Sequence, residues 1–174
     1  MSSPSTTRSQ AGLLAKTAGD AFEDEIEWGG NRYFAMGIAK LHRNKTRSDA
    51  KGNSDSLVFV PEASPPDFFG THITTGRTLV WDCKTVGGSI ATWTPDQTDL
   101  NQIAQYEEIM EWAAASACAG YLINSRKHNR VYIAHATLFN PAARRVVIPD
   151  CPYVPGRDST FIWDWISVLE GHYL

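Results

Sequence analysis

The sequence predicts a single α+β domain in which a central mixed β-sheet is flanked by helices. A chain of 174 residues fits one globular domain with enough interior for such a sheet. The hydrophobic fraction of 43% and the charged fraction of 20% are those of an ordinary folded protein. Helical and strand-like patterns follow one another from residue 11 to residue 174, after a polar tail at 1–10 that we expect to be disordered.

The first element is a helix predicted from Ala11 to Trp28. Apolar side chains recur four residues apart on one face of this helix, at Leu14, Ala18, Phe22 and Ile26. Most of its acidic residues are expected to form a solvated face. Gly29-Gly30 is expected to interrupt the helix, and a strand is predicted over Ile38–His42.

A β-hairpin is predicted in the middle of the chain. After a short strand at Leu57–Val60, the alternation from Thr78 to Thr85 favours a second strand, and Thr74-Thr75-Gly76 favours a turn before it. This turn would fold the segment from Asp67 back against the strand and bring the Asp67 and Asp82 carboxylates together.

The last elements are a long helix, two strands and a short apolar helix. The long helix is predicted from Pro95 to Ala119, with Asp96 or Thr98 as its cap. Two strands follow, at Gly120–Asn124 and Arg130–His135, and a final helix at Phe161–Leu169 is expected to cap the core.

The chemistry of the hairpin centres on Asp67, Asp82 and Lys84. Residues two apart on a strand share a face, so Asp82 and Lys84 stand side by side. Carboxylates are ligands for Mg²⁺, and a lysine ammonium adds a fixed charge that can hold a phosphate or a nucleophilic water. The spacing of Pro66-Asp67 and Asp82-Cys83-Lys84 is that of the PD-(D/E)xK nuclease motif. The alternative is a surface hairpin with a weak exposed ion pair.

Basic residues suggest contacts with nucleic acid in spite of a formal net charge of −3, which argues against binding over the whole surface. A polar loop at about 42–56 is interpreted as a binding arm or, alternatively, as a disordered connector. A second cationic turn lies at 125–129. The candidate nucleic-acid contacts in these two segments are Arg43, Lys45, Arg47, Lys51, Arg126 and Lys127.

Other residue types exclude several classes of protein. The cysteines Cys83, Cys118 and Cys151 are three in number and lack metal-site spacing, which argues against a disulfide scaffold or a structural zinc site. No apolar run is long enough for a membrane span or a secretion signal. We therefore expect a cytoplasmic protein, in a cell or in a virus-infected host cell, with no membrane partner.

Taken in order, these elements resemble the RecU-type Holliday junction resolvases, a branch of the PD-(D/E)xK nucleases with a restriction-endonuclease-like core. Gly19–Ile26 together with Asn31-Arg32-Tyr33 looks like that family's first-helix signature. Pro66–Gly70 is similar to its Asp-aromatic-x-Gly strand, and Asp82–Thr85 stands where the family has an acid, any residue, Lys and a nearby Thr. The resemblance covers roughly residues 19–139.

The resemblance implies roles for particular residues. Glu23, Asp67 and Asp82 would serve the metal, Lys84 would be the catalytic lysine, and Gln105 would support the site. Cys83, between Asp82 and Lys84, is included among the candidate metal-binding residues. Asp82 stands where the family more often has Glu, and Gln102, on the same helix face as Gln105, is the alternative for the glutamine position.

The resemblance also implies a homodimer with Mg²⁺, for which Mn²⁺ may substitute, and a stalk-like loop that enters a four-way DNA junction. The leading hypothesis is therefore a magnesium-dependent endonuclease that cuts branched DNA, most of all Holliday junctions. The alternatives are a restriction-like or repair nuclease that acts on linear or single-stranded DNA, and a DNA-binding module without catalytic activity.

Overall fold

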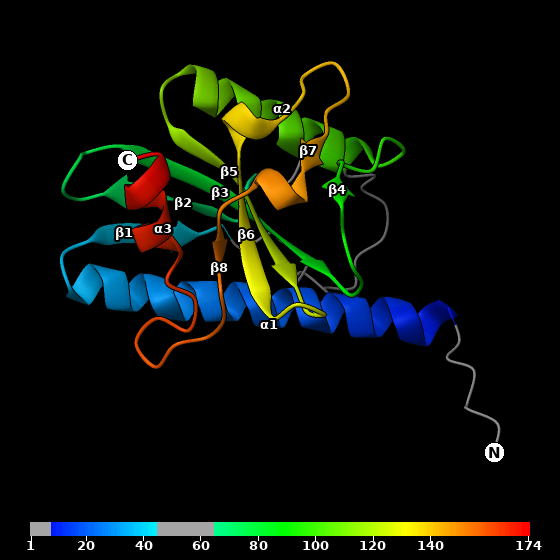
Figure 1. Cartoon of the computed structure of the whole chain (residues 1–174), viewed down its shortest axis with the longest axis horizontal. Helices are drawn as coiled ribbons and strands as arrows, with labels where there is room; N and C mark the ends of the chain where they lie inside the picture. Colours follow the sequence, from blue (N-terminus) through cyan, green and yellow to red (C-terminus); the bar gives the residue numbers. More distant parts are fainter. Residues whose placement is uncertain (1–7, 45–64) are drawn as a thin grey trace, which may run out of the picture.

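A six-stranded mixed sheet forms the centre of the computed structural model, which describes residues 8–44 and 65–174 (Figure 1). Its strands, in spatial order, are β1 (Ala39–Arg43), β2 (Phe68–His72), β3 (Thr78–Val86), β5 (Cys118–Ser125), β6 (Arg130–His135) and β8 (Tyr153–Val154). β3 and β5 run parallel, whereas the other neighbouring pairs are antiparallel. The predicted mixed sheet is thereby confirmed.

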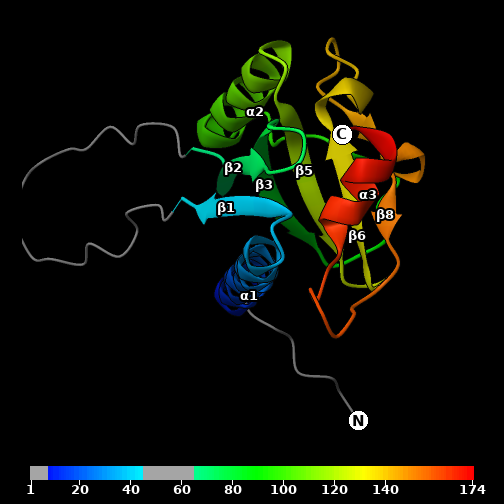
Figure 2. The ribbon, with the colours of Figure 1, turned by 90° about the vertical axis from the view of Figure 1, so that its left-hand side faces the viewer.

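Helices cover both faces of this sheet, as the prediction required (Figures 1 and 2). Buried side chains of α1 (Arg8–Ala35) and α3 (Trp165–His172) pack into one core cluster, and those of α2 (Leu100–Ala114) pack into a second. The second cluster also receives a small sheet of β4 (Thr92–Trp93) and β7 (Val146–Val147), together with the short 3₁₀ helices η1 (Ala136–Leu138) and η2 (Ile148–Asp150). The described helices include none that is long and apolar enough to cross a bilayer.

The first helix is longer than predicted at both ends. α1 begins at Arg8, so the expected disordered tail does not extend to residue 10, and it continues through Gly29-Gly30 to Ala35. A Cβ at Gly29 would lie 2.7 Å from the Phe161 carbonyl oxygen, and a Cβ at Gly30 would lie 3.3 Å from Leu41. The two glycines therefore allow close packing of the helix against its neighbours, and the prediction that they interrupt it was wrong.

The second helix is shorter than predicted. It begins at Leu100, because the Asp99 side chain accepts hydrogen bonds from the backbone N–H groups of Asn101 and Gln102. Asp96 instead closes a separate turn with Thr98, so neither of the two predicted caps is used. The helix ends near Ser116, whose φ of 70° is left-handed, and the apolar residues that follow begin β5.

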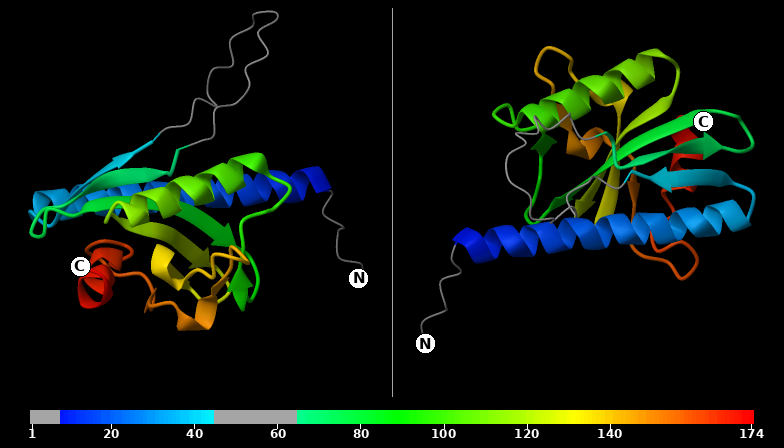
Figure 3. Two further views of the ribbon diagram at one scale, coloured as in Figure 1. Left: turned by 90° about the horizontal axis from the view of Figure 1, so that it is seen from above. Right: turned by 180° about the vertical axis from the view of Figure 1, so that it is seen from behind.

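The carboxyl-terminal helix caps the core as expected, although it begins at Trp165 and not at Phe161. Trp165, Ile166 and Leu169 are buried in the cluster shared with α1. The Tyr33 hydroxyl of α1 reaches the segment before α3, where it donates to the Asp164 carboxylate at 2.9 Å. Figure 3 shows α3 and the long α1 from two further sides.

Two predicted features fall outside the described residues. The strand at Leu57–Val60 and most of the basic loop at 42–56 lie in the range 45–64. The predicted hairpin is confirmed by the antiparallel pairing of β2 with β3, and the two later strands are confirmed as β5 and β6.

Candidate active site

The hairpin brings Asp67 beside the middle of β3. Phe68, the next residue, pairs with Trp81, which places Asp67 level with Asp82 across the two antiparallel strands. The Asp67 Oδ2 atom accepts a hydrogen bond from the backbone N–H of Cys83 at 2.7 Å. Asn44, just after β1, holds the other side of this segment by donating to the Pro66 carbonyl oxygen at 2.7 Å.

Asp82 is the most deeply buried acid of the site, with none of its surface exposed. Its Oδ2 atom lies 2.6 Å from the Nζ atom of Lys84, forming an ion pair. The other carboxylate oxygen, Oδ1, is buried and accepts no hydrogen bond from the residues that the structure describes. A buried carboxylate with unused acceptor capacity is costly unless a further partner satisfies it. The alternative of a weak surface ion pair is wrong, because the Asp82 side chain of this pair is fully buried.

The charges at this position shift one another's pKa values. Burial, followed by repulsion from Asp82, raises the pKa of Asp67 to about 8, although the hydrogen bond from Cys83 opposes the shift. Burial lowers the pKa of Lys84, but the carboxylates of Asp82 and Asp67 outweigh this effect and hold the pKa above its ordinary value. Lys84 is therefore an ammonium at neutral pH.

Gln105 reaches the site from α2, whereas Gln102 does not. The Lys84 ammonium donates a hydrogen bond to the Gln105 Oε1 atom at 3.3 Å, and Gln105 is buried. Gln102 is turned to the beginning of its own helix, where it contacts Asp96 and Asp99. Of the two glutamines that the sequence left open, Gln105 is thus the one in contact with the lysine.

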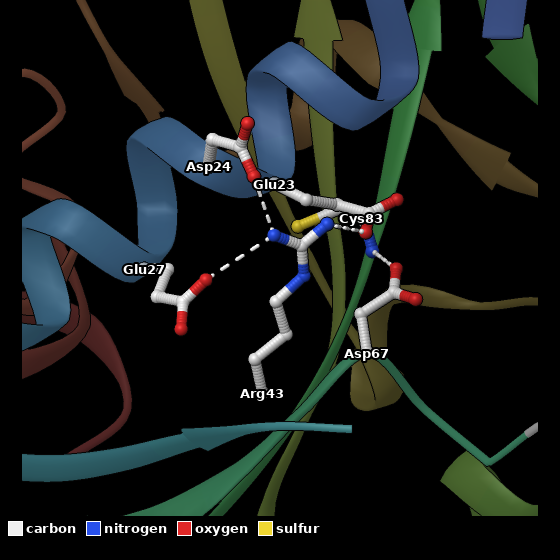
Figure 4. Close-up of polar contacts among 6 residues, drawn as sticks. All are labelled: Glu23, Asp24, Glu27, Arg43, Asp67 and Cys83. Carbon is white, nitrogen blue, oxygen red and sulfur yellow. Dashed lines mark hydrogen bonds and ion pairs between the residues drawn. The ribbon is translucent and has the colours of Figure 1, made fainter. Parts of the chain in front are cut away.

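Glu23 approaches the same position from α1, but Arg43 of β1 holds its carboxylate (Figure 4). The Arg43 Nη2 atom lies 2.6 Å from Glu23 Oε2. The Arg43 Nη1 atom lies 2.5 Å from Asp24 and 3.2 Å from Glu27. Burial raises the pKa of Glu23 in spite of Arg43, and Asp82 contributes to the rise.

Arg43 is a candidate nucleic-acid contact by sequence, and most of the helix acids are expected on a solvated face. In the structure Asp24 is still 71% and Glu27 41% exposed, but both carboxylates pair with the guanidinium of Arg43, whose side chain is 15% exposed. The spacing of Glu23 and Glu27, four residues apart on one helix face, was the signal available for this cluster. The sequence did not reveal that β1 lies against that face of the helix.

Cys83 takes part through its backbone and not through its thiol. Its side chain is buried with Phe22 and Ile26 of α1, because consecutive residues of a strand point to opposite faces. Burial raises the pKa of the thiol well above its usual value, so the group stays protonated. The Cys83 thiol therefore lies on the face of β3 opposite to Asp82 and would not reach a cation held by that carboxylate.

The donor set suits a hard divalent cation. Mg²⁺ takes one or two carboxylates and fills its other positions with water and phosphate oxygens. Asp67 and Asp82 provide these carboxylates, and Asp82 has an oxygen without a hydrogen-bond donor in the described part of the chain. No three His, Cys, Asp or Glu groups among the described residues are arranged to hold a metal ion, and Glu23 is directed at Arg43.

The second basic segment lies just beyond the site. Arg126 and Lys127 form the exposed turn after β5, whose last residue Ser125 pairs with Val86 of β3. Lys127 donates to Ser89 at 2.8 Å. Val86 is two residues past Lys84, or roughly 7 Å along the strand, so this turn lies close to the candidate site. Lys45, Arg47 and Lys51 lie outside the described residues.

No protein-family model matches the chain, and no curated protein matches its sequence. The geometry around Asp82 and the motif that contains it therefore carry the functional interpretation.

Proposed function

We propose that this chain is a metal-dependent endodeoxyribonuclease that hydrolyses phosphodiester bonds in branched DNA and resolves Holliday junctions as a homodimer. The observation that supports it best is the buried Asp82 carboxylate, which lies beside Asp67 and 2.6 Å from the Lys84 ammonium. The resemblance to RecU-type resolvases and to a restriction-endonuclease-like core belongs to the same proposal.

The chain's own residues divide the work between binding and positioning. Asp67 and Asp82 would hold Mg²⁺ or Mn²⁺, which when bound lowers the pKa of a coordinated water and offsets charge on the phosphate. Lys84 places a fixed positive charge next to Asp82, where it holds the attacking water or a phosphate oxygen. The Gln105 hydrogen bond limits the positions that the flexible lysine side chain can adopt.

The test of this activity is cleavage of a synthetic four-way junction by the purified protein with Mg²⁺. We expect paired nicks on opposite strands for the unchanged protein. Asp82→Asn and Lys84→Ala should each lower the rate by at least about a hundredfold, because an electrostatic group that acts in the transition state is worth that much. The exposed Asp150→Asn is the matched control and should cut at the normal rate. Equal cutting by Asp82→Asn would refute the proposal.

The choice of substrate is tested by competition at matched salt. Contacts with phosphates alone weaken steeply as salt rises and do not distinguish DNA shapes. We expect an unlabelled junction to inhibit cleavage of a labelled junction far better than linear duplex or single-stranded DNA of equal length does. Equal inhibition would favour a restriction-like or repair nuclease with the same active site.

A further inference from the structure

Arg43 uses the two ends of its guanidinium for different partners. Its Nη2 atom contacts Glu23 at 2.6 Å, whereas its Nη1 atom contacts Asp24 and Glu27 at 2.5 and 3.2 Å. The arginine side chain is only 15% exposed, whereas Asp24 and Glu27 are 71% and 41% exposed. Figure 4 shows the guanidinium between α1 and the strand residues Asp67 and Cys83.

Glu23 is the one member of this acidic group that also interacts with the site. Its carboxylate is repelled by Asp82, and it in turn repels Asp67. Three carboxylates that repel one another in a partly dry environment require a compensating cation. Arg43 supplies that cation now, and a divalent ion bound by Asp67 and Asp82 would supply it instead. The two cations therefore compete for Glu23.

We propose that Arg43 is an intramolecular counter-ion of this site. This inference rests on the proposed function. When a divalent ion binds, the Nη2 group leaves Glu23 for a phosphate oxygen of the DNA, while Nη1 stays anchored to Asp24 and Glu27. Asp24 and Glu27 are then positioning residues, and Glu23 becomes available to the ion or to its coordinated water.

The geometry of a guanidinium suits this exchange. Its planar fork binds carboxylate and phosphate oxygens in the same way, so Nη2 keeps a charged acceptor when it changes partners. The anchor at Nη1 keeps the side chain from moving away from the site when Glu23 is withdrawn. The exchange needs rotation of one side chain and no movement of β1 or α1.

The first experiment measures Mn²⁺ binding in the absence of DNA, at one neutral pH and ionic strength, by the electron paramagnetic resonance signal of free Mn²⁺. We expect Arg43→Ala and Arg43→Gln to bind Mn²⁺ on the order of tenfold more tightly than the unchanged protein, because a competing unit charge is removed at short range. In a Glu23→Gln background, Arg43→Ala should change the affinity by less than about twofold, because the shared carboxylate is gone.

The matched control is Arg157→Ala. Arg157 also pairs with a carboxylate of α1, that of Glu25. Glu25 lies on another face of the helix, where it accepts a hydrogen bond from the Trp163 side chain. This variant should bind Mn²⁺ as the unchanged protein does. If Arg43→Ala and Arg43→Gln bind no more tightly, or if the gain persists in the Glu23→Gln background, Arg43 does not compete for Glu23. If no variant binds Mn²⁺ at all, the proposed metal site and this inference fall together.

The second experiment measures binding of labelled junction DNA with Ca²⁺ and with a chelator, by fluorescence anisotropy. Ca²⁺ also takes oxygen ligands and should increase the DNA affinity of the unchanged protein. Arg43→Ala should lose most of this increase although it binds Mn²⁺ more tightly, and Arg157→Ala should keep it. Tighter binding of Mn²⁺ together with a smaller Ca²⁺-dependent gain in DNA affinity would not follow from a structural role of Arg43 alone. An undiminished increase in Arg43→Ala would refute the phosphate contact.

Discussion

At the scale of single residues, the candidate site lowers the free energy of unfolding. Asp67 and Asp82 are two neighbouring carboxylates in a largely buried position, and within residues 8–44 and 65–174 Lys84 is the cation that pairs with Asp82. Burial and mutual repulsion both disfavour the charged form of Asp67. Under the proposed function a cation held by Asp67 and Asp82 would relieve this repulsion, so the residues that bind it would destabilise the fold without it.

A pH-dependent stability follows for Asp67→Asn in metal-free protein. The pKa of Asp67 is about 8 in the folded protein and lies near about 3.9 in an unfolded chain. The folded state therefore retains a proton that the unfolded state releases, and the contribution of Asp67 to stability falls as pH rises from about 4 to about 8. By this linkage Asp67→Asn should gain roughly 3–4 kcal/mol more over the unchanged protein at pH 8 than at pH 5.

Urea unfolding of both proteins at the two pH values measures this difference. Asn keeps an oxygen that can accept the Cys83 N–H, so the hydrogen bond at 2.7 Å need not be lost. A stability difference that is the same at both pH values would show that Asp67 does not titrate as described.

At the scale of elements, α1 positions one side of the site through its close approach to its neighbours. The helix presents Glu23 toward the site and, about two turns later, contacts the segment before α3 at Gly29. Tyr33 secures this end through its contacts with Asp164 and its stacking on Phe161, whose ring centroid is 4.3 Å away. The height of the helix above the sheet thus depends on the absence of a side chain at Gly29.

Two alanine substitutions in α1 separate packing from helix propensity. Gly29→Ala should destabilise the protein by about 1–3 kcal/mol, because its Cβ would meet the Phe161 backbone at 2.7 Å and one element must move. Gly19→Ala has no atom within 4 Å of its Cβ and should stabilise the protein by about 0.5–1 kcal/mol. Thermal or urea unfolding measures both effects. A stabilising Gly29→Ala would contradict the role assigned to this glycine.

At the scale of the whole molecule, a junction resolvase needs two active sites related by a two-fold axis, since its substrate has that symmetry. An exposed apolar group at one end of α1 offers a surface for such a dimer. Phe34 is 58%, Met36 57% and Ile73 46% exposed. Ile73 lies next to this end because its N–H donates to the Ile38 carbonyl at 2.8 Å. Under the proposed function we assign the dimer surface to this group, because exposed apolar patches occur at interaction surfaces.

If the proposed homodimer uses this surface, Ile73→Asp should weaken it at least tenfold, since a charge must be buried at a cost above about 1.4 kcal/mol. Sedimentation equilibrium measures the dissociation constant. Leu100→Asp is the control, because Leu100 is 80% exposed at the beginning of α2, in a different element. A monomeric unchanged protein, or equal weakening by both variants, would refute this surface.

The sequence alone was sufficient for the elements that have strong local patterns. The alternation around Thr78–Thr85 predicted β3, and the turn before it predicted the hairpin that joins Asp67 to Asp82. The predicted ends of the helices were less accurate where a residue that resembles a local stop or continuation signal serves a contact with a distant segment. Gly29-Gly30 resembles a helix break but serves a contact with residue 161, and the apolar residues after Ser116 belong to a strand beside β3.

What the sequence determined by itself is the inventory of charged side chains and their periodicity, since spacing along a strand or helix decides which residues share a face. It could therefore place Asp82 beside Lys84. Only the tertiary structure decided that Asp82 is fully buried, that Gln105 contacts Lys84 in preference to Gln102, and that Arg43 holds Glu23. These three results depend on how α1, α2 and β1 approach β3, and such distances arise from packing between segments far apart in the chain.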